Sequence, residues 1–158
     1  MAESTLFVTG VPQGVTPLTL TLDKAQLNLD RAVLVDAQHA GPQSIHFVSS
    51  GVPAQSCQVR VVDPQRCVAL ADDLVGEIWV SSPSVSGGYR NRPQLSQEVL
   101  QATLEGEPQR RFLRTGDLGF MHQGELFVTG RRKDLIIIDG KNHYPTTLNR
   151  PSKAPSPS

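Results

Sequence analysis

Short apolar runs, rich in β-branched residues, recur along the chain between turns rich in Gly, Pro, Asp and Ser. Such runs predict strands, here at residues 18–22, 32–35, 45–48, 58–62, 77–80, 125–128 and 135–138. Many short strands at close spacing are typical of antiparallel barrels and sandwiches. The pattern predicts a mainly β, α+β fold around a distorted antiparallel β-barrel, with inward positions at Val61, Ile78, Val80, Phe127, Val128, Ile136 and Ile138.

Helix signals are few. One helix is predicted at residues 93–104, where Asn91 can cap the helix and Pro93 can occupy its first turn. Leu95, Val99 and Leu100 would give that helix its apolar face. A shorter helix is predicted at residues 23–27.

Composition excludes several classes of function. Fifteen basic and fifteen acidic residues leave no net charge, and the absence of a basic block argues against a nucleic-acid partner. No apolar run is long enough for a membrane span. Cys57 and Cys67 are isolated and lack metal-binding spacing. With no secretory signal at the N-terminus, the sequence predicts a protein of the reducing cytoplasm.

Two polar clusters stand on either side of residues 119–129. The first is Arg114-Thr115-Gly116-Asp117-Leu118, and the second begins at Gly130-Arg131-Arg132-Lys133-Asp134. Gln123-Gly124 suits a hairpin turn between them, because Gly tolerates positive φ. A hairpin returns the chain to its starting edge, so Asp117 and Arg131 are predicted neighbours.

This pair has the chemistry of a nucleotide site. An ionised carboxylate at Asp117 can accept both ribose hydroxyls, and the Arg131 guanidinium can donate to phosphate or ribose oxygens. The structural alternatives are an Asp117 that accepts local backbone N–H groups and an Arg131 that is a solvated surface charge.

Together with Gly140-Lys141-Asn142-His143-Tyr144-Pro145, these clusters resemble the adenylate-forming ligases, and specifically the fatty acyl-AMP ligases. The resemblance implies that a fatty acid and ATP give acyl-AMP and pyrophosphate, with Mg²⁺. The acyl group then passes to an acyl carrier protein or polyketide synthase. It also implies that Asp117 holds the ribose hydroxyls, that Arg131 faces the nucleotide, and that Lys133 is a hinge for a mobile lid.

The first residues resemble a family segment that faces the adenylate. By that resemblance Ala2 and Glu3 belong to the nucleotide site, and Glu3 helps to hold Mg²⁺, a cation that prefers carboxylate oxygen. The structural alternative is that Glu3 is an acid at a frayed terminus.

The resemblance assigns residues 1–145 to the C-terminal portion of a large N-terminal adenylation domain. Residues 11–50 look like the insertion that is thought to block the movement needed for a CoA reaction. Residues 146–158 are rich in Pro and Ser, and disorder is predicted there. The segments 76–80 and 87–93 also match the family, and we interpret them as structural.

The family's phosphate-cradling loop and the lysine of its lid have no counterpart in these 158 residues. The sequence therefore predicts a fragment of a fatty acyl-AMP ligase that is inactive alone. The alternatives are a non-catalytic nucleotide- or protein-binding module and a gene remnant without activity.

Overall fold

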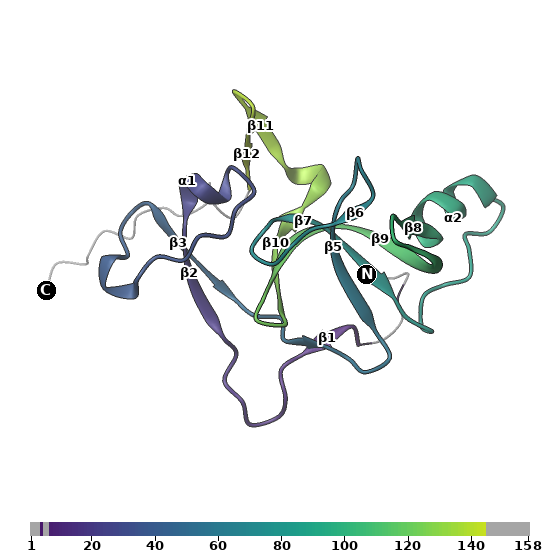
Figure 1. Ribbon diagram of the computed structural model, residues 1–158, viewed down its shortest axis with the longest axis horizontal. Coiled ribbons are helices and arrows are strands. Elements are labelled where there is room, and N and C mark those ends of the chain that lie inside the picture. Colours follow the sequence, from purple (N-terminus) through teal and green to yellow (C-terminus); the bar gives the residue numbers. More distant parts are fainter. Residues whose placement is uncertain (1–3, 5–6, 145–158) are drawn as a thin grey trace, which may run out of the picture.

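The computed structural model describes Ser4 and residues 7–144, so Ala2, Glu3, Pro145 and the predicted tail at 146–158 lie outside the described residues. The described part of the chain is mainly β, with two short α-helices and two 3-10 turns (Figure 1). The helical elements are α1 (Lys24–Leu27), η1 (Ala37–His39), α2 (Pro93–Leu100) and η2 (Arg132–Asp134). The strands are β1 (Thr9–Gly10), β2 (Thr19–Asp23), β3 (Ser44–Val48), β4 (Val52–Pro53), β5 (Gln58–Asp63), β6 (Val68–Ala69), β7 (Gly76–Ser81), β8 (Ala102–Leu104), β9 (Glu107–His122), β10 (Glu125–Arg131), β11 (Ile136–Ile138) and β12 (Lys141–His143).

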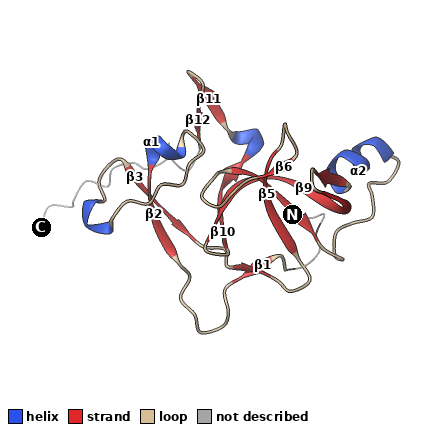
Figure 2. Ribbon diagram, in the orientation of Figure 1, coloured by secondary structure: helices blue, strands red, loops and turns tan. Residues whose placement is uncertain are grey.

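A six-stranded antiparallel sheet organises the molecule. Its order is β10-β9-β7-β5-β6, with β8 paired to β9. The sheet curls into a half-barrel (Figure 2), and the predicted barrel-like β fold is confirmed. β9 is the longest strand and was not among the predicted runs, because its Arg, Gln and Gly positions break the apolar alternation.

Alternation along β5 and β7 places the two faces of the sheet in different cores. Val59, Val61, Ile78, Val80 and Leu126 pack together on one side. Val62, Trp79, Leu104 and Phe112 form a second cluster. The predicted inward positions Val61, Ile78, Val80 and Phe127 are confirmed as buried.

Three predicted inward positions are wrong. Val128 is 43% exposed because it points away from the face of Phe127 and lies in the edge strand β10, directly before the register shift to Gly130. Ile136 and Ile138 are 46% and 51% exposed because, among the described strands, β11 pairs only with β12 and stands apart from the six-stranded sheet. Figure 1 shows the β11–β12 hairpin projecting from the body of the molecule.

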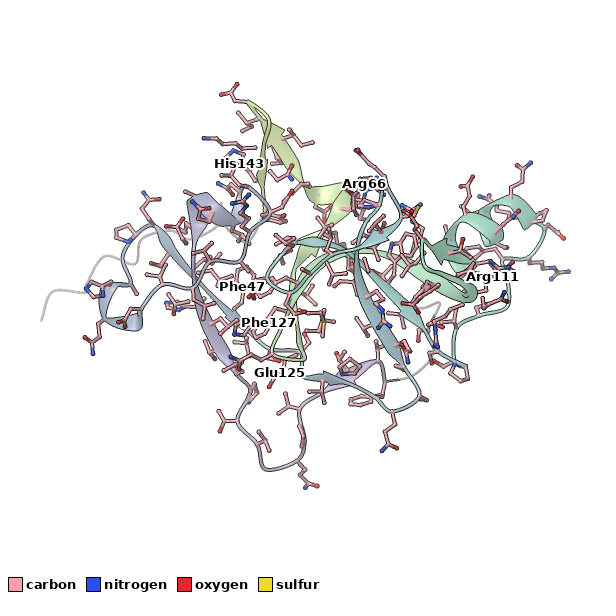
Figure 3. All side chains as sticks on the ribbon, in the orientation of Figure 1. Phe47, Arg66, Arg111, Glu125, Phe127 and His143 are labelled. Carbon is pink, nitrogen blue, oxygen red and sulfur yellow. The ribbon has the colours of Figure 1, made fainter. Side chains whose placement is uncertain are left out.

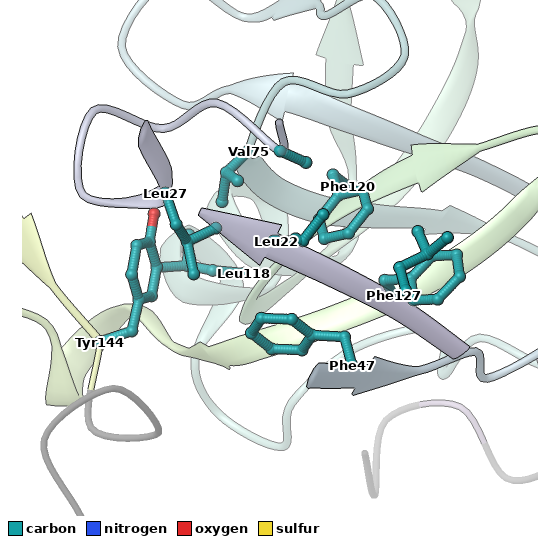
Figure 4. Close-up of a cluster of buried hydrophobic side chains, with 10 residues drawn as sticks. Leu22, Leu27, Phe47, Val75, Leu118, Phe120, Phe127 and Tyr144 are labelled. Atoms are coloured by element: carbon teal, nitrogen blue, oxygen red, sulfur yellow. The ribbon is translucent and has the colours of Figure 1, made fainter. Parts of the chain in front are cut away.

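Residues 19–48, called the β2–β3 lobe below, pack against one face of the sheet. Leu22 and Phe47 of the lobe lie in one buried cluster with Phe120 and Phe127 of the sheet (Figure 4). The predicted strand at 32–35 is not formed as a strand. Its residues instead run beside β2, where Asp23 N–H bonds to Val33 O and Val35 N–H to Thr21 O.

The helices differ from prediction only at their ends. Asp23 caps α1 by accepting the Gln26 N–H at 2.9 Å, so the helix predicted at 23–27 is confirmed. α2 ends at Leu100, and the predicted residues 101–104 turn into β8. Arg92 precedes α2 without a side-chain cap, and Asn91 adopts a left-handed conformation (φ 59°) instead of capping. No helix in the described part of the chain is long and apolar enough to cross a membrane.

Candidate functional site

The β9–β10 hairpin brings the two polar clusters together. Its turn residues Gln123 and Gly124 both have positive φ, 50° and 81°, as a tight hairpin turn requires. The register shifts between Val128 and Gly130, which sets Arg131 directly opposite Asp117. The predicted hairpin and its turn are confirmed.

Asp117 and Arg131 form a pair at the rim of the sheet. The distance from Arg131 Nε to Asp117 Oδ1 is 3.7 Å, and the two side chains are 62% and 27% exposed for Arg131 and Asp117 respectively. An exposed pair at this separation is worth about 1 kcal/mol or less. The predicted proximity is confirmed, and the pair presents an acceptor and a cation to solvent at one edge.

A bulge in β9 sets the direction of Asp117. Trp79 of β7 is paired with Arg114, whereas Glu77 is paired with Leu118, so three residues of β9 oppose Ile78. Thr115 Oγ1 donates to Ile78 O at 2.6 Å and accepts the Asp117 N–H at 3.1 Å. Bulges of this kind are common beside active sites, where they re-aim a side chain.

Glu77 lies beneath this bulge and is 2% exposed. Its carboxylate accepts from Arg114 Nη2 at 3.0 Å and from the Gly116 N–H at 3.2 Å, and Arg132 Nη1 lies 3.7 Å away. The Arg114 guanidinium also lies over the Trp79 ring, 5.3 Å from its centroid. The sequence alone favours a structural role for residues 76–80. An acidic residue amid consecutive buried apolar positions was the available signal.

Comparison with known proteins connects this geometry to a family, although no protein-family model matches the chain. JamA of Moorena producens, a medium-chain fatty acid–acyl-carrier-protein ligase, is 39% identical over all of this chain and 27% of its own length. FadD26 of Mycobacterium marinum, a long-chain-fatty-acid–AMP ligase, is 40% identical over 94% of this chain and 26% of its own length. A fatty acyl-adenylate ligase from L. pneumophila, solved with acyl adenylate and pyrophosphate, has a TM-score of 0.74 at 43% identity. That match covers 84% of this chain and 22% of the solved chain.

This chain corresponds to one segment of the longer fatty acyl-AMP ligases. It spans about a quarter of the length of the curated relatives named above. The predicted likeness to a fragment of such a ligase is therefore confirmed.

Other residues that the resemblance to fatty acyl-AMP ligases singled out fall in different places. Lys133 lies in η2, an exposed turn between β10 and β11. Ala2 and Glu3, the latter proposed for Mg²⁺, lie outside the described residues. Within Ser4 and residues 7–144, no group of three or more His, Cys, Asp or Glu side chains could hold a metal ion.

The described part of the predicted family motif, residues 140–144, docks on the β2–β3 lobe. Asn142 Nδ2 donates to both carboxylate oxygens of Asp30, at 3.0 and 2.8 Å, and Tyr144 Oη donates to Asp30 Oδ1 at 2.5 Å. Burial, together with Asp30, raises the pKa of the Tyr144 phenol well above its ordinary value. His143, the residue between these two donors in the sequence, lies at the end of β12 in the projecting hairpin (Figure 3).

A cleft of about 520 Å³ lies between the lobe, the sheet and the β11–β12 hairpin. Asp30, Glu77, Arg132, Leu135 and Tyr144 are among its lining residues. Asp117 and Arg131 are not part of that lining, so the candidate pair faces the open rim and not the cleft.

Proposed function

We propose that residues 1–145 are the nucleotide-binding end of the adenylation domain of a fatty acyl-AMP ligase. The observation that carries this proposal is the opposition of Asp117 and Arg131 across the bulged β9–β10 hairpin, at 3.7 Å. The proposal is supported by the likeness to ligases that act on fatty acids, of which one was solved with acyl adenylate.

In the proposed reaction, a carboxylate oxygen of the fatty acid attacks the α-phosphorus of ATP. The bond from that phosphorus to the bridging oxygen breaks, and pyrophosphate leaves with acyl-AMP as the product. Asp117 accepts the two ribose hydroxyls, while Arg131 donates to ribose or phosphate oxygens. The acyl group then passes to an acyl carrier protein, which supplies a polyketide synthase. JamA is itself named as a carrier-protein ligase.

The proposed insertion at 11–50 has support in the topology. β1 and β4 pair with each other on either side of these residues, with Gly10 opposite Val52. The chain therefore leaves and returns at the same point, as it does around an inserted segment. Lys133, in the exposed turn after β10, is the proposed hinge. The two free cysteines, Cys57 and Cys67, suit the proposed cytoplasmic location.

We expect the isolated 158-residue chain to be inactive in adenylation. The groups that stabilise charge on a reacting phosphate typically supply several kcal/mol, and neither the phosphate loop nor the lid lysine of the family has a counterpart in the sequence. The chain would be incubated with ATP, Mg²⁺ and a long-chain fatty acid while pyrophosphate is measured. Release well above a buffer control would contradict this expectation.

AMP should bind weakly at the Asp117–Arg131 rim. Because Arg131 is exposed and Asp117 is only half-buried, water screens the pair, and we expect a Kd of about 1 mM or weaker. Backbone amide shifts would be followed by NMR during an AMP titration. The largest shifts should fall at residues 115–118 and 130–132, and Asp117→Ala should weaken binding roughly tenfold, as expected for loss of charge-assisted hydrogen bonds.

The matched control is Asp72→Ala, which removes an exposed carboxylate from the loop before β7. It should leave AMP binding unchanged. Shifts confined to residues far from Asp117, or binding that survives Asp117→Ala, would refute the nucleotide assignment.

A further inference from the structure

We propose that Glu77 is a positioning residue for the candidate nucleotide site. It holds the bulge that carries Asp117 and the strand end that carries Arg131 in one fixed arrangement. The proposal rests on the nucleotide role proposed above, although the coupling of the two segments can be tested without a ligand.

Glu77 is a charged residue type in a fully buried stretch of strand. The residue lies in β7, where each position from Gly76 to Val80 is buried. A carboxylate removed from water is costly unless hydrogen bonds and opposite charges replace the lost hydration. Glu77 receives these from Arg114 and Gly116 of β9 and from Arg132, which follows β10.

The partners of Glu77 are the immediate neighbours of the candidate ligands. Gly116, whose N–H bonds to Glu77 Oε1 at 3.2 Å, directly precedes Asp117. Arg132, whose Nη1 lies 3.7 Å from Glu77 Oε2, directly follows Arg131. One buried carboxylate therefore touches the residue beside each member of the pair.

A gain in folding stability is a weak explanation for a buried carboxylate paired with arginines. Desolvation of buried ions offsets most of their attraction, and a well-packed apolar side chain is often equally stable in their place. Hydrogen bonds to a charged carboxylate are directional, however, and they can fix the bulge that an apolar residue would leave free. Trp79 supports the same geometry by covering the Arg114 guanidinium.

The test compares Glu77→Gln with Glu107→Gln. Glu77→Gln keeps the size of the side chain and one acceptor but removes the charge. Glu107 is also paired with two arginines, Arg60 at 3.0 Å and Arg110 at 3.3 Å, at the start of β9. Glu107→Gln is therefore matched in chemistry but lies at the far end of the strand from the site.

In an AMP titration, Glu77→Gln should weaken binding roughly tenfold, whereas Glu107→Gln should leave the affinity unchanged. Urea unfolding of both variants shows how much stability each substitution costs. If Glu77→Gln is folded and binds AMP as tightly as the unchanged chain, the proposal is overturned.

A second measurement uses amide resonances, requires no nucleotide, and changes no buried side chain. Arg132 is 47% exposed, so Arg132→Gln should leave the fold intact. If Glu77 couples the two segments, Arg132→Gln should shift the Gly116 and Asp117 amide resonances. The same substitution made in the Glu77→Gln background should shift them much less.

The outcomes separate the two proposals. Absence of AMP shifts at Asp117 and Arg131 in the unchanged chain would defeat the proposed function, yet the amide measurement would still decide the coupling. If Arg132→Gln leaves the Gly116 and Asp117 amide shifts unchanged, the proposed role of Glu77 is overturned, whatever the AMP titration shows.

Discussion

Phe120→Ala should lower the free energy of unfolding by about 3–5 kcal/mol, the range for truncating a fully buried aromatic side chain. Phe120 is fully buried and stacks on Phe127 with ring centroids 5.1 Å apart. The Phe120 ring also forms a T-shaped contact with Phe47 of the β2–β3 lobe, with ring centroids 6.3 Å apart. The truncation would leave a cavity where the lobe and the sheet join. Urea unfolding followed by circular dichroism measures the loss.

Phe7→Ala is the control for this substitution, because it removes the same atoms from a side chain that is 63% exposed. It should change the free energy of unfolding by about 0.5 kcal/mol or less. Because Phe47 belongs to the lobe, Phe120→Ala should also speed amide hydrogen exchange in β2 and β3. Equal effects from the two substitutions would show that the lobe does not depend on this junction.

Local signals in the sequence predicted much of the candidate site. The hairpin around Gln123-Gly124 was predicted from turn chemistry, which was enough to make Asp117 and Arg131 neighbours. Their direct opposition depends on the register shift between Val128 and Gly130, which the sequence pattern did not predict. The short strands were also predicted from local signals, namely apolar runs rich in β-branched residues. β9 was missed because residues 107–119 carry charged and glycine positions where an alternating strand would be apolar.

Features that depend on distant partners could not be read from the pattern. Ile136 and Ile138 have the composition of a core strand, and nothing in their periodicity says that β11 would pair only with β12. Glu77 takes its role from residues 37 and 39 positions away, Arg114 and Gly116. Asp30 meets its partners across more than 110 positions. Such contacts are set by the tertiary arrangement.

Asp30→Ala should loosen the β11–β12 hairpin from the lobe and lower the free energy of unfolding by about 2–4 kcal/mol. It removes the carboxylate that accepts from the half-buried Asn142 and the buried Tyr144, at about 1–2 kcal/mol for each part-buried hydrogen bond lost. Asp30 also joins the lobe to the sheet through its backbone, since its carbonyl accepts the Val75 N–H at 2.8 Å. Hydrogen exchange should rise across β11 and β12, measured by mass spectrometry.

Asp139→Ala is the matched control, because Asp139 shares the left-handed backbone of Asp30, with φ of 50° against 59°, but lies exposed at the tip of the hairpin. The difference between the two alanine variants therefore isolates the carboxylate contacts from the backbone cost. If both variants unfold at the same urea concentration and exchange alike, Asp30 does not anchor the hairpin.

The pH dependence provides a second readout of the same contact. Burial raises the pKa of Tyr144 in the folded chain above its unfolded value of about 10, so the folded state holds the phenolic proton more tightly. The stability contribution is therefore fully present below about pH 10 and is lost as the pH rises beyond it. Tyr144→Phe has no proton to lose, so stability should fall less steeply above about pH 10 in this variant than in the unchanged chain. Parallel pH profiles for the two proteins would mean that Tyr144 is not held as a buried donor to Asp30.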